Sequence, residues 1–192
     1  MQLLPASGHR IQRWKNGGGA TTEIAVHPGG AGLDEFEWRV SMAAMTVDGP
    51  FSVFPGVARI LAVLDGPGVV LSAGSFGEKT LTRETPPFAF DGGEPVACRL
   101  IDGRTTDLNL MFREDRYRCA MQRLPISGTL RLPPAPGTRF VVLIDGKIAV
   151  SGSSSTLNLM PFDALRDTGG ATLEINAAEP SLAFVLTIAA LK

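Results

Sequence analysis

Short runs in which apolar and polar residues alternate follow one another along the whole chain. In Asp34–Met42, every second residue from Phe36 onward is apolar and the residues between are polar. A strand with this period of two has one apolar and one polar face. Asp-Gly pairs, typical of hairpin turns, end three such runs at 65–66, 102–103 and 145–146. No long segment has the 3.6-residue period of an amphipathic helix, and we expect one helical turn, at Pro161–Asp167. We therefore predict an all-β protein.

An internal similarity predicts two related halves. The stretch Pro55–Gly66 resembles Pro136–Gly146, and from the arginine to the glycine of each the two match without a gap. Self-similarity of this kind is typical of a duplicated unit. We predict an N-terminal barrel at residues 1–123, which carries the motif loop, and a smaller C-terminal barrel at residues 124–192 packed on it as one compact unit. Chance similarity between apolar strands that end in Asp-Gly is the alternative.

The order of strand, glycine turn, second strand and proline-rich strand start is typical of a cupin, a small jelly-roll barrel. We therefore predict a two-lobed, cupin-like (RmlC-like) fold, a duplicated bicupin. The usual cupin metal site needs two histidines two apart, a glutamate and a later histidine. The chain has only His9 and His27, neither in that spacing. Arg59 and Arg139 take the position of the metal glutamate, seven residues before each turn glycine.

An arginine in this position changes the expected ligand. A guanidinium facing the barrel interior repels a metal ion and offers a planar fork that matches a carboxylate or a phosphate. We predict a small acid bound without metal or other cofactor. The alternative is that Arg59 pairs with an internal carboxylate such as Glu23 and only tunes the core.

Composition narrows the function classes further. Of the 192 residues 44% are hydrophobic, and the net charge is −1 with no basic tract, which gives nucleic-acid binding no electrostatic support. No run approaches the ~18 apolar residues of a membrane span, and the N-terminus lacks the features of a secretory signal. Cys98 and Cys119 have no metal-ligand spacing and are expected to be buried free thiols. We expect a cytoplasmic protein with no nucleic-acid or membrane partner, and we leave a homodimer open.

Polar residues gather in the stretch Arg13–Glu23, which contains three adjacent glycines. Ordering three glycines costs much backbone entropy, so the chain there must turn sharply or a ligand must approach closely. A hairpin between two strands and a ligand-facing loop are both compatible with this pattern.

The candidate site follows from which residues share a face of each predicted strand. Pointing the polar faces of the motif strands into the first barrel would bring together two arginines, two carboxylates, a hydroxyl and an amide, with Asp107 and Met111 on the same face as Asn109. Buried charges must be paired, hydrogen-bonded or bound to a ligand. The candidate ligand-binding residues are Trp14, Lys15, Asn16, Gly17, Gly18, Glu23, Arg39, Ser41, Arg59 and Asn109.

Four motifs in order resemble the HutD/Ves family: Trp14–Gly19, the aromatic and polar residues of Phe36–Ser41, Asp48–Gly56, and Asp107–Met111. The resemblance implies a cupin-like, two-lobed protein without a bound metal. It also implies a link to bacterial histidine utilisation, in which such proteins limit pathway activity by binding an intermediate such as urocanate or formylglutamate. One departure is Ala58, where the family often has an acidic residue before the arginine.

Two hypotheses of different classes follow. The first is a regulatory protein that binds a small carboxylate and has no catalytic residue. The second is a metal-free isomerase or lyase with Glu23 as general base and Lys15 or Arg39 stabilising an enolate. A protein-interaction module is a third, weaker hypothesis. The sequence favours binding over catalysis because both histidines lie in predicted loops, which leaves the usual proton shuttle without a candidate.

Overall fold

The computed structural model describes residues 1–14 and 17–191. In this part of the chain all regular structure is β-strand except one 3-10 turn, η1 (Ala6–Gly8), so the predicted all-β class is confirmed. No helix in this part is long and apolar enough to cross a membrane.

The chain divides into two compact units, Arg10–Arg116 and Met1–His9 with Tyr117–Lys192. The predicted boundary after residue 123 falls inside β12 (Tyr117–Leu132), which is paired with β17 (Leu173–Ala190) on both sides of that position. The first residues join the C-terminal unit because β1 (Gln2–Leu4) pairs with β16 (Ala164–Asp167). The predicted packing of the two barrels on each other stays a prediction.

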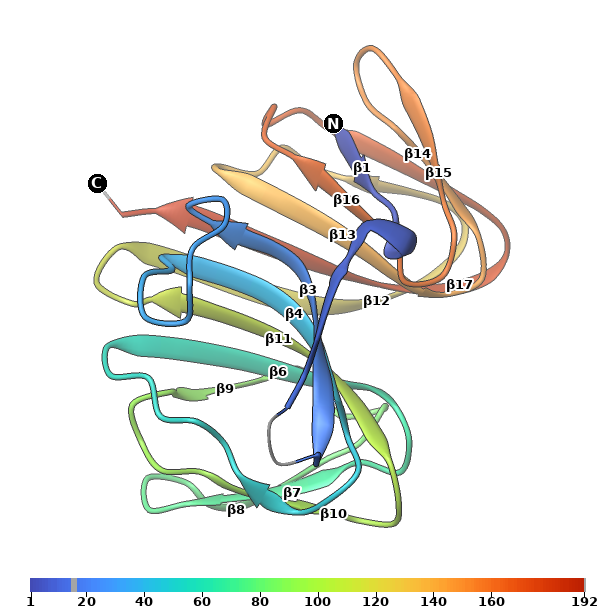
Figure 1. Cartoon of the computed structure of the whole chain (residues 1–192). Helices are drawn as coiled ribbons and strands as arrows, with labels where there is room; N and C mark the ends of the chain where they lie inside the picture. The colour runs from blue at the N-terminus through green and yellow to red at the C-terminus, as the bar shows by residue number, and fades with distance from the viewer. Residues whose placement is uncertain (15–16, 192) are drawn as a thin grey trace. The chain divides into compact units, whose positions relative to one another are not determined.

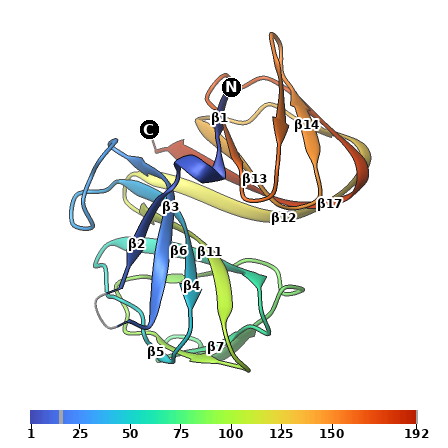
Figure 2. The same cartoon turned by 45° about the vertical axis from the view of Figure 1, so that its right-hand side comes forward.

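Two antiparallel sheets form the unit Arg10–Arg116 (Figures 1 and 2). The six-stranded sheet has the order β2-β3-β4-β11-β6-β9, and the four-stranded sheet the order β5-β10-β7-β8. Core residues from both sheets, including Leu61 of β6 and Leu71 of β7, pack in one cluster, so the sheets face each other as in a jelly roll. The strands are β2 (Arg10–Arg13), β3 (Gly19–His27), β4 (Trp38–Met45), β5 (Gly49–Pro50), β6 (Val57–Asp65), β7 (Val69–Ala73), β8 (Gly77–Leu81), β9 (Phe88–Asp91), β10 (Ala97–Leu100) and β11 (Thr105–Arg113).

The other unit is built around the long strand β17, which pairs with β12, β13 and β14 (Figure 1). Where the sequence predicts separate strands at 172–175 and 182–188, β17 runs through both with register shifts. Aliphatic side chains such as Val141 and Leu165 fill its core. Its further strands are β13 (Thr138–Asp145), β14 (Ile148–Ser151) and β15 (Thr156–Leu159).

The predicted helical turn at Pro161–Asp167 is wrong. Phe162 has a positive φ of 69°, which ends any right-handed turn there. The Asp163 carboxylate accepts hydrogen bonds from the backbone N–H groups of Ala6 and Met160, at 2.8 and 2.9 Å. The following residues then pair as β16 with β1 and β13.

The two strands that match in the internal similarity, β6 and β13, have corresponding neighbours in their sheets. β6 pairs with β9 and β11, and β13 pairs with β16 and β17. The correspondence agrees with the internal similarity in the sequence, and duplication of a single cupin unit stays a prediction.

The turn after β6 needs a glycine at Gly66, which has a φ of +89°; a Cβ there would lie 2.2 Å from the carbonyl oxygen of Arg104. We expect Gly66→Ala to lower the free energy of unfolding by ~2–4 kcal/mol, because backbone strain and the clash add. Gly103→Ala is the matched control, since Gly103 has a φ of +76° and open space around it, and should cost ~1 kcal/mol. Urea unfolding curves measure both, and equal losses would contradict the role of the close approach.

Candidate functional site

A cavity of about 580 Å³ lies within the unit Arg10–Arg116. Its walls come from the inward faces of β4, β6 and β11, from the start of the β2–β3 hairpin and from the segment 47–54. Of the predicted ligand-binding residues, five line it: Trp14, Arg39, Ser41, Arg59 and Asn109.

Strand register explains why these side chains meet. On β11, Asn109 lies opposite Ser41 of β4 and Leu61 of β6, while Met111 lies opposite Arg39 and Arg59. Residues two apart on a strand share a face, so Asp107 joins the same wall. The shared face predicted from parity is therefore observed for β4, β6 and β11.

Arg59 is held in the wall by aromatic rings. It is 5% exposed, and its guanidinium carbon lies 4.5 Å from the ring centre of Phe51 and 5.2 Å from that of Phe90. Its Nε has no hydrogen-bond partner in the described part of the chain. Burial lowers the pKa of Arg59 to about 10, against an opposing effect of Asp107, so the side chain stays charged at neutral pH.

The alternative in which Arg59 pairs with Glu23 is wrong. Glu23 accepts a hydrogen bond from Nε of Arg39 at 2.8 Å, and the two side chains form an ion pair. Glu23 is not among the residues that line the cavity. Its carboxylate therefore orients Arg39, which does line the cavity.

Asp107 and Asn109 present unsatisfied acceptors. Asp107 is 1% exposed, and neither its Oδ1 nor the Oδ1 of Asn109 has a hydrogen-bond partner among the described residues. Burial raises the pKa of Asp107 to about 7, although the charge of Arg59 opposes this rise. The two acceptors and the Arg59 donor belong to one cavity.

The glycine stretch is part of the hairpin between β2 and β3, and it also shapes the cavity mouth. Trp14 lines the cavity and its Nε1 donates to Oγ1 of Thr21 at 2.8 Å. A Cβ at Gly19 would lie 2.3 Å from the carbonyl oxygen of Ala44, so the close approach here is between backbones. The hairpin interpretation is therefore confirmed, and the role as a ligand-facing loop stays a prediction.

The other loop candidates do not reach the cavity wall or cannot be placed. Gly17 and Gly18 are not among the lining residues. Lys15 and Asn16 lie outside the described residues.

Two important residues were not on the list of predicted binding residues. Phe51 packs against the core and also lines the cavity, where its ring lies under the Arg59 guanidinium. Asp107 was predicted to lie on the same strand face as Asn109 but was not included among the predicted binding residues. Its spacing of two residues from Asn109 on one strand could have identified it.

The matched arginine of the C-terminal unit has a different environment. Arg139 donates to Asp167 at 2.9 Å and to the backbone carbonyls of Pro133 and Ala171 at 2.7 and 2.8 Å. Both partners of the ion pair are buried. Arg139 therefore holds its own barrel together, whereas Arg59 faces a cavity.

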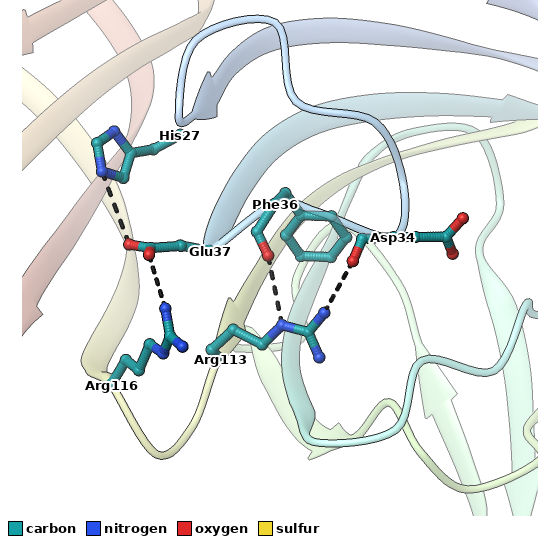
Figure 3. Close-up of polar contacts among 6 residues, drawn as sticks. All are labelled: His27, Asp34, Phe36, Glu37, Arg113 and Arg116. Carbon is teal, nitrogen blue, oxygen red and sulfur yellow. Dashed lines mark hydrogen bonds and ion pairs between the residues drawn. The ribbon is translucent and has the colours of Figure 1, made fainter.

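A second hollow of about 550 Å³ lies beside the loop before β4. Figure 3 shows Arg113 donating to the backbone oxygens of Phe36 and Asp34, both at 3.3 Å, and it also donates to Pro55. Glu37 accepts from Arg116 at 2.8 Å and lies 3.7 Å from His27 (Figure 3). Arg113 and Arg116 thus fasten loop groups around this hollow.

We also examined whether the described side chains could bind a metal ion. Among the described residues, no group of three or more histidine, cysteine, aspartate or glutamate side chains is placed to hold a metal ion. His27 stacks on Trp38 with ring centres 5.4 Å apart and is not in the cavity wall.

Comparisons with known sequences identify the family of this chain. A family model described as HutD matches residues 6–185. An uncharacterised 21.2 kDa protein from the hutC 3′ region of Pseudomonas putida is 36% identical over 170 residues, 88% of this chain and 87% of that protein. Protein Ves of Cronobacter sakazakii is 41% identical over 123 residues, 64% of this chain and 66% of its own length.

Solved structures give the same result. HutD from Pseudomonas fluorescens SBW25, solved in a formate condition, superposes with a TM-score of 0.84 at 30% identity, covering 100% of this chain and 99% of its own. The pirin YhhW from Escherichia coli, in complex with nickel(II), superposes with a TM-score of 0.73 at 10% identity, covering 100% and 99%. The similarity to the pirin concerns the fold alone. This fold is the cupin-like fold predicted from the sequence. Since the family model spans most of the chain and the P. putida relative most of both proteins, the chain belongs to the HutD family.

Proposed function

We propose that this protein binds a small carboxylate in the cavity of the unit Arg10–Arg116 and that Arg59 is the main contact of the acid. The observation that carries the proposal is the buried Arg59 guanidinium, which lines the cavity and forms no ion pair with the described residues, whereas the matched Arg139 pairs with Asp167. A ligand carboxylate would provide that guanidinium with charge-assisted hydrogen bonds.

Free-energy considerations support a ligand for Arg59. An uncompensated buried charge costs several kcal/mol, and folded proteins retain one mainly where it serves function. Stacking on Phe51 and Phe90 fixes the guanidinium plane before any ligand arrives, which reduces the entropy lost on binding. Arg39, which is oriented by Glu23, supplies a second cation in the same wall.

The names of the relatives indicate the biological setting. The P. putida relative is named for the hutC 3′ region, and the P. fluorescens structure is named HutD. We therefore propose a regulatory role in histidine utilisation, with an acidic intermediate such as urocanate or formylglutamate as the ligand.

A metal-free isomerase or lyase with Glu23 as general base is the second candidate. The ion pair with Arg39 and the absence of Glu23 from the cavity wall count against it. Glu23→Gln separates the two functions, because a binding protein should keep most of its affinity and an enzyme should lose turnover by orders of magnitude.

A thermal-shift screen of the metal-stripped protein tests the proposal. The panel is urocanate, formylglutamate, glutamate, formate, tartrate and phosphate. An acid at ~100 times its Kd should add ~2.7 kcal/mol of stability. We expect Arg59→Met to weaken its binding ~100-fold, because a charge-assisted bidentate contact is lost.

Arg99→Met is the matched control, since Arg99 is exposed on β10 and outside the cavity wall, and it should leave affinity unchanged. Unchanged binding in Arg59→Met would place the acid elsewhere. No shift with any acid on the panel would contradict the proposed function.

A further inference from the structure

We infer that the acid bound in this cavity also carries an N–H donor, an amide or an ammonium group, which Asp107 and Asn109 hold. The inference rests on the proposed function, because the same cavity binds the acidic group through Arg59. It adds a second recognised group and so defines the class of ligand more closely.

The unsatisfied polar atoms of the cavity are of two kinds. Arg59 lacks a partner for a donor, Nε, while Asp107 and Asn109 each lack a partner for an acceptor, Oδ1. Buried polar atoms in folded proteins are nearly always hydrogen-bonded, so three in one cavity indicate a missing partner. A simple carboxylate has only acceptors and can satisfy Arg59 alone.

The described residues satisfy these groups only in part, since Asp107 receives a backbone hydrogen bond from Ala43 while its Oδ1 has no partner. Arg59 and Asp107 influence each other electrostatically, yet they form no hydrogen bond or ion pair with each other in the structure. Each is at least nineteen-twentieths buried. A molecule between them that offers an acceptor to one and a donor to the other would compensate both charges.

Strand geometry places the two kinds of group at different depths. Arg39 and Arg59 lie at the level of Met111, and Asn109 and Asp107 follow two and four residues away on the same face of β11. Those separations correspond to ~7 and ~14 Å along the strand. The ligand therefore lies along β11 with its acidic end towards the arginines and its N–H end towards the two acceptors.

Specificity follows from the buried acceptors. A site built to hydrogen-bond a ligand N–H rejects an analogue that lacks it, because the acceptor is then left desolvated and unpaired. We expect the cavity to discriminate against analogues of the ligand in which the N–H group is absent or is replaced by oxygen.

Two matched pairs of four-carbon acids test this in the wild-type protein by isothermal titration calorimetry. Succinamate carries an amide N–H that monomethyl succinate replaces with an ester. 4-Aminobutyrate carries an ammonium that butyrate lacks. We expect the N–H member of at least one pair to bind ~10–100-fold more tightly than its partner. The favoured pair tells whether the donor is an amide or an ammonium.

Two variants test whether Asp107 and Asn109 cause the preference for the ligand with an N–H group. Asn109→Leu and Asp107→Leu should each reduce the ratio between pair members to within ~3-fold while the acid itself still binds. Replacing a buried polar group by an apolar one of similar volume is well tolerated, and the melting temperature of each unliganded variant checks the fold. If a variant fails to fold, the wild-type pairs alone decide.

The failures of the two proposals can be distinguished. If both members of each pair bind equally well, the inference is wrong and the proposed carboxylate function stands. If no acid binds, the proposed function is wrong and the inference with it. A preference that survives both leucine variants would also overturn the assignment to Asp107 and Asn109.

Discussion

Replacing Arg139 by methionine is expected to lower the free energy of unfolding by ~3–5 kcal/mol, while the same change at Arg59 costs less than ~1 kcal/mol or stabilises the protein. Removing Arg139 leaves Asp167 buried without its cation and frees two backbone carbonyls. Removing Arg59 takes away a buried charge that the protein itself does not pair.

The two positions are a matched experiment, because they align in the internal similarity and differ in their partners. Far-UV circular dichroism follows the unfolding of both units, because both are built of β-strands. Tryptophan fluorescence reports on the unit Arg10–Arg116 alone, since both tryptophans, Trp14 and Trp38, lie within it. The double change Arg139→Met with Asp167→Leu should recover most of the loss.

Equal losses at the two positions would mean that Arg59 is a structural residue like Arg139, which would remove the main support for ligand binding. A loss at Arg139 alone would mean that the first unit has given up stability for an open, charged wall, as binding sites commonly do.

The alternating pattern predicted the fold class well because strand parity is a local property. The period of two in β4 and β11 placed Arg39 and Asn109 on the correct face before their neighbours in space were known. Long-range pairing carried no comparable signal. Nothing local shows that β1 pairs with β16, or that one strand runs through Leu173–Ala190, and both features move the boundary between the units.

Charge pairing was the weakest part of the sequence-based prediction. Parity gave the cavity two arginines and two carboxylates without saying which would pair. Glu23 lies opposite Ser41 in the register, two residue pairs from Arg39, and takes Arg39 as its partner. This choice leaves Arg59 and Asp107 for the cavity.

Raising the pH from 4.5 to 8 is expected to destabilise the wild-type protein by ~3 kcal/mol relative to Asp107→Asn. Burial raises the pKa of Asp107 from 3.8 to about 7, and this difference corresponds to ~4 kcal/mol in total, of which ~1 kcal/mol is lost below pH 4.5. Between these two pKa values the folded protein binds more protons at Asp107 than the unfolded chain does, so stability falls as the pH rises. Above pH ~7 both states are ionised and the loss is complete.

Arg59 and Cys98, which interact electrostatically with Asp107, do not titrate in this window. Burial leaves the pKa of Arg59 at about 10 and raises that of Cys98 to about 12, so the first stays charged and the second neutral from pH 4.5 to 8. Urea unfolding followed by tryptophan fluorescence at several pH values measures the difference between the two proteins. Asp102→Asn, which removes an exposed carboxylate of the same unit, is the control and should follow the wild type.

A wild-type protein whose stability follows Asp107→Asn across this range would show that Asp107 is ionised and well solvated in the folded state. Its Oδ1 would then have no need of a partner, and the case for a ligand N–H donor would rest on Asn109 alone. If succinamate binds, it can be added to both proteins at pH 8. Loss of the stability difference between the wild type and Asp107→Asn would then mean that the ligand compensates the buried carboxylate, because ligand binding stabilises the ionised form that burial penalises.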